Sequence, residues 1–315
     1  MRTLTKRSLA SLPAVALALA MALSACAPPA ARQQEAVPSL GVQVAWPSAD
    51  SSLATLAGGA PAVNHPDAKP RPTASVAKVI TILTVLQKHP LAAGQPGPSL
   101  KLDAGDVELY NHTTSVGGSS LLVHEGMVMS QHAMLEAMLL PSANNVADSL
   151  ALWAFGSMEA YRSAATDYVL SLGMKSTTIG TDASGFSPST TSTAGDLALL
   201  ARAAMKEPVV AEIAAQGTAV IPGYGPVQNT NTLLGTSGVV GLKTGTSPDA
   251  GGVFLFAANV TLKGSATLLV GAVMGAGDTA ADAMEETGKL LASVRDAPIG
   301  TGSGVSLGTA TGVAP

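Results

Sequence analysis

Residues 71–78 read RPTASVAK, and Ser75 begins an apolar helical pattern that continues to Leu86. Lys78 follows Ser75 by three positions, so a helix would place both side chains on one face. A serine hydroxyl becomes a strong nucleophile when a neighbouring base takes its proton, and apolar surroundings make a lysine lose its own proton more easily. The stretch therefore predicts a nucleophile, Ser75, and its base, Lys78, although a helix cap followed by a surface lysine has the same pattern.

A second short motif, Ser142-Ala143-Asn144, follows Pro141 between two apolar helical patterns. Its serine could pass a proton to a leaving nitrogen, and its asparagine could hold an amide of a peptide substrate. Pro, Ser and Asn also favour turns for purely local reasons, so an ordinary loop explains the motif better when it is taken by itself.

A third motif, Lys243-Thr244-Gly245-Thr246, ends the strand-like segment 239–243. One cationic group and two hydroxyls suit a substrate carboxylate. Gly245 would let a substrate backbone lie close to the strand, and a strand edge can accept an extended peptide as an additional strand. The alternative is a strand end without a function.

Hydrophobic periodicity predicts an order of strands, helices, strands and a final helix. We expect two early segments to form an N-terminal hairpin. Because these early strands have no other partners nearby in the sequence, we also expect them to pair with the late strands. The fold class is therefore α/β: an antiparallel sheet from N- and C-terminal strands, an inserted helical subdomain, and a cleft between the two. The expected hairpin is 41–46 with 51–57, the helices lie near 75–86, 130–140, 144–155, 157–172 (ended by Gly173), 193–206 and 278–294, and the late strands are 239–243, 253–260 and 266–274.

The three motifs occur in a fixed order, with 67 positions from Ser75 to Ser142 and 168 from Ser75 to Lys243. In this order the sequence resembles the D-alanyl-D-alanine carboxypeptidases, which are low-molecular-mass penicillin-binding proteins of the β-lactamase-like fold. The resemblance runs from about Val42 to Ala276. It continues through VGGSSLLVHEG (116–126), MLLPSANNVADSLA (138–151), STAGDLALLARAA (192–204) and NTNTLLGTSGVVGLKTGTSPDAGG (229–252).

The resemblance implies a serine-peptidase mechanism on peptidoglycan stem peptides. Ser75 would attack the carbonyl between two terminal D-alanines, with Lys78 as the base. The backbone N–H groups of Ser75 and Thr246 would form the oxyanion hole, and Ser142 would pass a proton to the departing D-alanine. Water would then release the acyl group, and β-lactams would bind covalently as inhibitors.

The resemblance also assigns the substrate-binding residues. Asn144 would hold the peptide amide, and Lys243, Thr244 and Thr246 would bind the terminal carboxylate beside Gly245. No cofactor is implied. No metal site is predicted either, because the five histidines are scattered at His65, His89, His112, His124 and His132.

The chain departs from the family pattern at two places. Ala143 and Asn145 stand where the family often has Gly and Asp, and Thr246-Ser247 is typical of many β-lactamases. A β-lactamase is therefore an alternative, but class A enzymes need a glutamate, and the corresponding segment KSTTIGTDASG (175–185) has none. A non-catalytic penicillin-binding lipoprotein that keeps the fold is the other alternative.

The N-terminus predicts export. Three basic residues precede the apolar run Leu9–Leu23, and Leu23-Ser24-Ala25-Cys26 resembles the bacterial lipoprotein box. Cys26 is the only cysteine, so we expect it to carry a lipid that anchors the protein to the membrane on the cell-wall or periplasmic side. An ordinary cleaved signal or an uncleaved anchor remains possible.

Composition and low-complexity segments divide the chain into four parts. We expect a signal peptide at 1–25, a lipid-anchored linker at 26–39, a catalytic domain at 40–296 and a disordered tail at 297–315. Lys and Arg number 17 against 21 Asp and Glu, which excludes a basic nucleic-acid-binding protein.

Overall fold

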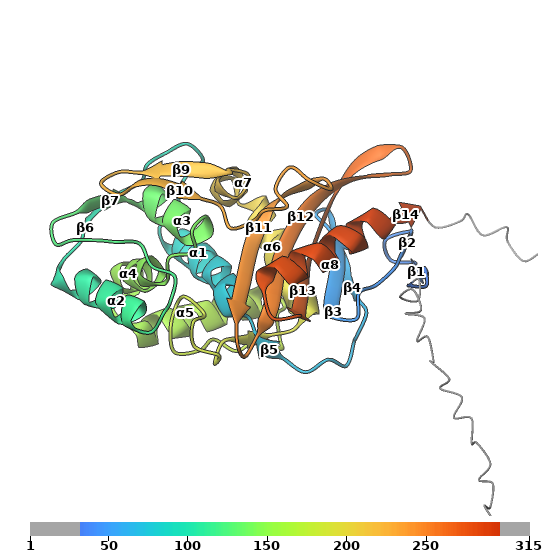
Figure 1. The fold of residues 1–315 in the computed structure, drawn as a ribbon, viewed down its shortest axis with the longest axis horizontal. Coiled ribbons are helices and arrows are strands. Elements are labelled where there is room, and N and C mark those ends of the chain that lie inside the picture. Colours follow the sequence, from blue (N-terminus) through green and yellow to red (C-terminus); the bar gives the residue numbers. More distant parts are fainter. Residues whose placement is uncertain (1–31, 297–315) are drawn as a thin grey trace, which may run out of the picture. The chain divides into compact units, whose positions relative to one another are not determined.

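The computed structural model describes residues 32–296, and an antiparallel sheet of five strands organises them (Figure 1). The strand order is β11-β12-β13-β3-β4. The first strands of the chain therefore pair with the last ones through β3 and β13, which confirms the predicted sheet. The strands are β3 (Asp50–Thr55), β4 (Gly58–Val63), β11 (Val239–Ser247), β12 (Gly251–Leu262) and β13 (Ser265–Ala276).

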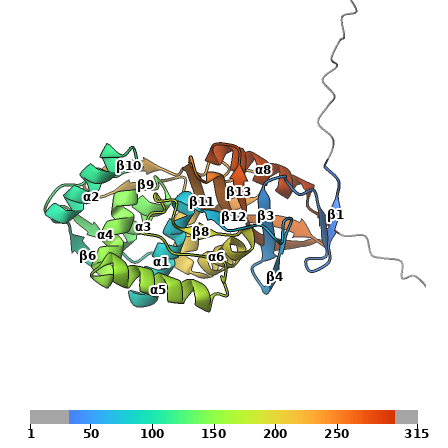
Figure 2. The same cartoon turned by 90° about the horizontal axis from the view of Figure 1, so that it is seen from below.

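Helices cover both faces of this sheet: α8 (Ala280–Ser293) lies on one face and α6 (Ala194–Lys206) on the other (Figure 2). Alternate residues of a strand point to opposite faces. Phe254 and Phe256 of β12 accordingly belong to the core under α8, whereas Leu255 belongs to the core under α6. Burial on both faces explains why β12 is a nearly continuous apolar run.

A helical subdomain is inserted between β4 and β11. A short 3₁₀ turn, Ala74–Val76, leads directly into its central helix. The helices are α1 (Ala77–Lys88), α2 (Ala104–Ser115), α3 (Gln131–Leu139), α4 (Asn144–Phe155), α5 (Met158–Ser171) and α7 (Pro208–Ala214). Three short two-stranded sheets complete it, β5 (Arg71–Pro72) with β8 (Thr191–Ser192), β6 (Ser99–Lys101) with β7 (Val128–Ser130), and β9 (Thr218–Ile221) with β10 (Gly225–Gln228).

Local chemistry sets the helix ends that the sequence predicts. The Ser157 hydroxyl accepts the Ala160 N–H at the start of α5, and Gly173 follows that helix with a φ of +83°, where glycine carries no steric cost.

Two helices are not predicted from periodicity. In α2 only Thr113 is buried, so the helix has almost no apolar stripe, and α7 is only seven residues long.

The predicted N-terminal hairpin is wrong. Its first segment contains β2 (Val42–Val44), which pairs with β1 (Glu35–Val37) and β14 (Arg295–Asp296) in a separate three-stranded sheet. Its second segment contains β3, whose hairpin partner is β4. The stretch between the segments is held away from hairpin geometry, because Asn64 Nδ2 donates to the carbonyl oxygens of Pro47 and Ala49.

The expected linker at 26–39 is also too long. Its residues 35–37 form β1, and Val37 is buried. The predicted signal peptide, Cys26 and the tail at 297–315 lie outside the described residues. None of the helices between residues 32 and 296 has the length and apolarity that crossing a bilayer requires.

Candidate active site

Ser75 and Lys78 form a direct pair at the start of the central helix. Ser75 lies in the 3₁₀ turn and Lys78 in the first turn of α1, and Lys78 Nζ donates to Ser75 Oγ at 2.9 Å. The same ammonium donates to Asn144 Oδ1 at 2.6 Å and to the Ser184 carbonyl at 3.0 Å. All three of its protons therefore have acceptors, and one acceptor is the predicted nucleophile.

The surroundings of Lys78 suit a base. Lys78 is fully buried, and burial lowers its pKa to about 7, although the carboxylates of Asp148 and Asp182 oppose this shift. A base with a pKa near the working pH is present in its neutral form and still accepts a proton readily. Loss of one proton from Lys78 would let the Ser75 hydroxyl donate to Nζ instead.

In the second motif, Asn144 contacts Lys78, whereas the Ser142 hydroxyl has no hydrogen-bond partner within residues 32–296. Asn144 begins α4, and its backbone N–H donates to the Ser119 carbonyl. Ser142 is buried with a φ of +68°, and its Oγ has no hydrogen-bond partner within residues 32–296. Its hydroxyl is therefore free to exchange a proton with a bound molecule.

Asn145, a departure from the family pattern, fixes the loop that covers this motif. Its Oδ1 accepts the Leu121 N–H and its Nδ2 donates to the Leu121 carbonyl, each at 3.0 Å. The loop at 116–123 is thereby tied to the start of α4, next to Asn144. The amide thus has a structural role that the sequence did not reveal.

The third motif lies on β11, which is an edge strand of the five-stranded sheet. A Cβ atom on Gly245 would lie 3.1 Å from the Thr73 carbonyl oxygen and 3.3 Å from the Ser75 backbone nitrogen. A side chain at this position would push β11 away from Ser75 by a few tenths of an ångström, so glycine allows the close approach. The strand edge therefore forms one wall beside Ser75.

Lys243 on this strand is buried, and no carboxylate of residues 32–296 forms an ion pair with it. Its Nζ donates to the Thr244 carbonyl at 3.0 Å, and burial, aided by the positive charge of Lys78, holds its pKa well below the usual range. Thr244 Oγ1 lies 2.6 Å from Thr230 Oγ1, and Thr246 Oγ1 accepts the Ala280 N–H at 2.7 Å. The Thr246 hydroxyl keeps its proton available for a ligand.

A comparison with known families now decides the assignment. The family model for D-alanyl-D-alanine carboxypeptidase matches residues 60–278, a range that contains all three motifs. This chain belongs to the D-alanyl-D-alanine carboxypeptidase family. The search of curated protein sequences finds no relative of it.

Solved structures of DD-peptidases share the fold. The Streptomyces K15 DD-transpeptidase is 21% identical, with a TM-score of 0.68 over 78% of this chain and 97% of that one. The D-alanyl-D-alanine carboxypeptidase of Mycobacterium tuberculosis is 27% identical, with a TM-score of 0.65 over 78% of this chain and 90% of that one. The β-lactamase-like fold expected from the sequence is confirmed.

Four residues at this DD-peptidase site were not found by sequence reasoning: Ser184, Asp148, Asp182 and Thr230. The Ser184 contact uses a backbone carbonyl, which no side-chain pattern reveals. Asp148, in contrast, follows Asn144 by four positions, so its place on the same helical face was readable from the sequence.

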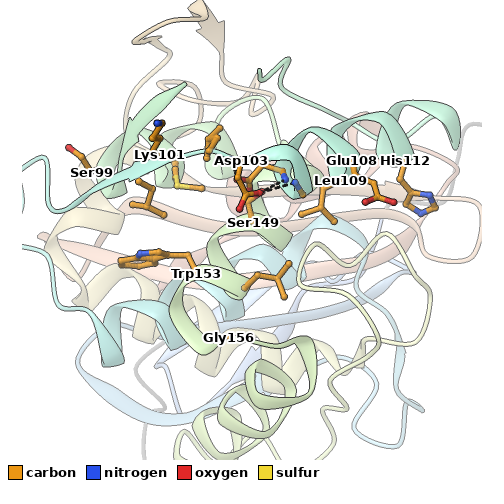
Figure 3. A pocket seen from close by; sticks show the side chains of 15 residues that line it. Ser99, Lys101, Asp103, Glu108, Leu109, His112, Ser149, Trp153 and Gly156 are labelled. Atoms are coloured by element: carbon orange, nitrogen blue, oxygen red, sulfur yellow. Dashed lines mark hydrogen bonds between the residues drawn. The ribbon is translucent and has the colours of Figure 1, made fainter. Parts of the chain in front are cut away.

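A large pocket lies away from the three motifs. It has a volume of about 860 Å³, and residues of β6, α2 and α4 line it, Trp153 and His112 among them (Figure 3). It contains no residue of the three motifs. We take the motif residues as the candidate active site, because they bring the Ser75 hydroxyl into contact with the buried Lys78. Residues 32–296 contain no group of three or more potential metal ligands.

Proposed function

We propose that this protein is a serine D-alanyl-D-alanine carboxypeptidase that trims peptidoglycan stem peptides through an acyl-enzyme on Ser75. The observation that carries the proposal is the 2.9 Å contact between Ser75 Oγ and a fully buried Lys78. Ser75 itself is only half-buried. A substrate carbonyl can therefore reach the hydroxyl while its base stays away from water.

The first step forms a bond from Ser75 Oγ to the carbonyl carbon of the penultimate D-alanine. The serine proton goes to neutral Lys78, and the carbonyl oxygen gains negative charge. Backbone N–H groups of Ser75 and Thr246 would stabilise that oxyanion. The proximity of Gly245 to the Ser75 backbone nitrogen supports this, because it brings β11 beside the nucleophile.

The second step breaks the C–N bond. The proton reaches the leaving amine of the terminal D-alanine through Ser142, whose unpartnered hydroxyl is suited to relaying it. Water then attacks the ester, with Lys78 again accepting a proton, and hydrolysis frees Ser75. The overall reaction consumes one water and yields the shortened peptide and D-alanine.

The buried ammonium of Lys243 supports recognition of a terminal carboxylate. A cation without a counter-ion is unstable in a buried place, and an incoming carboxylate would stabilise its charged form. Thr244 and Thr246 would add hydroxyl donors on the same strand. Asn144 donates through Nδ2 if it holds the substrate amide, because its Oδ1 accepts from Lys78.

Covalent binding of penicillin follows from the same chemistry, because a β-lactam presents a carbonyl and a carboxylate. The segment in which a β-lactamase would carry its glutamate has Asp182 instead. The Asp182 carboxylate accepts the N–H groups of Ser184, Gly185 and Ser187. Because these three N–H groups already occupy the carboxylate, we expect it not to activate a deacylating water and the penicillin adduct to be long-lived.

The test uses the purified protein with a fluorescent penicillin and, separately, a peptide that ends in D-Ala-D-Ala. A stable adduct together with D-alanine release is the expected result, and Ser75→Ala should lose both. Rapid penicillin turnover without peptide cleavage would identify a β-lactamase, and no adduct at all would indicate a non-catalytic protein. Adding an amine acceptor separates hydrolysis from the transpeptidation that the Streptomyces relative's name describes.

We also propose that Cys26 is lipidated and that this lipid attaches the protein to the outer face of the cytoplasmic membrane or to the periplasmic side. The support is the sequence Leu23-Ser24-Ala25-Cys26 after an apolar run. Cys26→Ser should prevent acylation. The variant should then leave the detergent-soluble membrane fraction, or it should accumulate in an unprocessed form. Unchanged mass and unchanged fractionation of that variant would contradict the proposal.

A further inference from the structure

The loop at 182–187 lies against the faces of two helices that carry the active site. On α4, Asp148 follows Asn144 by four positions, and on α1, Thr81 follows Lys78 by three, so each pair shares a helical face. Asn144 and Lys78 contact each other. Asp148 and Thr81 are the next residues along these two faces, and both contact the loop.

The peptide groups of Ala183 are held on both sides. Asp148 Oδ1 accepts the Ala183 N–H at 2.9 Å, and Thr81 Oγ1 donates to the Ala183 carbonyl at 2.6 Å. The next carbonyl along the chain, that of Ser184, accepts from Lys78 at 3.0 Å. A displacement of Ala183 would therefore move an acceptor of the catalytic ammonium directly.

The Asp148 carboxylate also acts on Lys78 through its charge. It raises the pKa of Lys78, as Asp182 does, against the larger effect of burial. Asp148 lines a small cavity of about 70 Å³ together with Asn144, Ser184 and Asp182. Burial raises the pKa of Asp148 itself to about 6, so the carboxylate is charged at the pH at which Lys78 must lose its proton.

We propose that Asp148 is a positioning residue for the Ser75–Lys78 pair. Its carboxylate accepts the Ala183 N–H and so fixes the Ala183–Ser184 backbone on which Lys78 rests, and its negative charge favours the ammonium form of Lys78. The kinetic test of this role rests on the proposed function. The titration test does not, because it needs no enzymatic activity.

Several other ionisable groups face this pair and must be considered with it. Asp182 approaches from the loop, Tyr161 from α5, and His112 from α2, where it lines the same small cavity. Lys243 faces Lys78 from β11. Of these, only Asp182 shares with Asp148 a negative charge that favours the ammonium form of Lys78.

Two substitutions separate the hydrogen bond from the charge. Asp148→Asn keeps an oxygen that accepts the Ala183 N–H and removes the charge, whereas Asp148→Ala removes both. Asp196→Asn is the matched control, because Asp196 also accepts a loop N–H, that of Ser176 at 2.8 Å, but does not contribute to the pKa of Lys78. A general effect of removing a loop-binding carboxylate would appear in all three variants.

The first measurement is the titration of Lys78 by NMR of ¹³C-labelled lysine side chains, with Lys78→Met to assign the signal. Asp148→Asn should lower the titration midpoint by roughly 0.5–1 pH unit, because an anion that favours the ammonium is lost. Asp196→Asn should leave the midpoint unchanged. An unaltered midpoint in Asp148→Asn would overturn the electrostatic role.

The second measurement is the rate of acylation by fluorescent penicillin across pH. Asp148→Asn should shift the acidic limb of the profile downward by the same amount, and Asp148→Ala should also lower the plateau roughly ten- to a hundredfold, because misplacement by about 1 Å is that costly. Wild-type kinetics in Asp148→Ala would overturn the positioning role. If the wild type is not acylated at all, the proposed function fails, while the NMR titration still decides the role of Asp148.

Discussion

Asn144 Oδ1 accepts a hydrogen bond from Lys78 Nζ at 2.6 Å, so the second motif completes the environment of the base. The resemblance assigned Asn144 to the substrate amide alone. In the structure its carbonyl oxygen is occupied, and only the Nδ2 group is available to a ligand. One side chain therefore connects Lys78, the proposed base, with the predicted substrate cleft.

This contact predicts the effect of placing a charge there. Asn144→Asp should put a carboxylate against Lys78, stabilise the ammonium and raise its pKa. Penicillin acylation at pH 7 should fall by about fivefold or more and recover at higher pH, because a lysine pKa that rises from about 7 to about 8 lowers the neutral fraction from about one half to about one tenth. A rate that stays low at every pH would instead indicate loss of amide binding or of the fold.

Substitution of Ser75 or of Lys78 should each prevent or strongly slow acylation, because the two residues act together. Ser75→Ala should abolish the covalent adduct, and Lys78→Arg should lower acylation by roughly 10³-fold or more, because arginine stays protonated and cannot accept the serine proton. Intact-protein mass spectrometry after penicillin treatment measures both. Normal adduct formation in either variant would contradict a shared role of the two residues.

The pH dependence of acylation should follow Lys78. Its pKa is lowered by burial to about 7, so below pH 7 the lysine holds its proton and cannot act as a base. The acylation rate should rise as pH increases through about 7 and then level off. Stopped-flow measurement with a fluorescent penicillin tests this, and an acidic limb centred near pH 10, the ordinary lysine range, would contradict it.

The close approach of β11 to the nucleophile predicts that Gly245 cannot carry a side chain without loss of rate. Gly245→Ala places a methyl group 3.2 Å from Ala74 Cβ, so the strand or the turn must shift by a few tenths of an ångström. We expect acylation to fall roughly tenfold with the fold intact by circular dichroism.

The control for that substitution is Gly288→Ala on α8. A Cβ atom there meets nothing within 4 Å, and alanine is the better helix former by about 0.5–1 kcal/mol. This variant should keep its acylation rate and gain slightly in Tm. Equal rate losses at both positions would show that the effect of Gly245→Ala is not local.

Substitution of Ser142 should change stability and activity in opposite directions. Its φ of +68° is costly for a residue with a side chain, by about 1 kcal/mol, and its hydroxyl makes no hydrogen bond within residues 32–296. Ser142→Gly should therefore raise Tm by about 2–4 °C while it slows D-alanine release. A lower Tm in this variant would show that the hydroxyl has a structural partner.

The sequence by itself indicated that early and late strands share one sheet and that a helical subdomain is inserted between them, because buried segments carry strong periodicity. The helices α3 to α6, the hairpin of β12 and β13, and the motif residues Ser75, Lys78 and Lys243 were all placed correctly on their elements. Spacing within a helix also sufficed to predict that Ser75 and Lys78 meet. These inferences depend only on residues near one another in the chain.

Tertiary structure alone decided which distant groups meet Lys78. The Ser184 carbonyl lies 106 positions away from it, and backbone groups leave no signature in a sequence. It also decided that β2 leaves the expected hairpin for a sheet with β1 and β14, since strand pairing depends on partners far along the chain. Burial, which lowers the pKa values of Lys78 and Lys243, exists only once those distant segments have packed together.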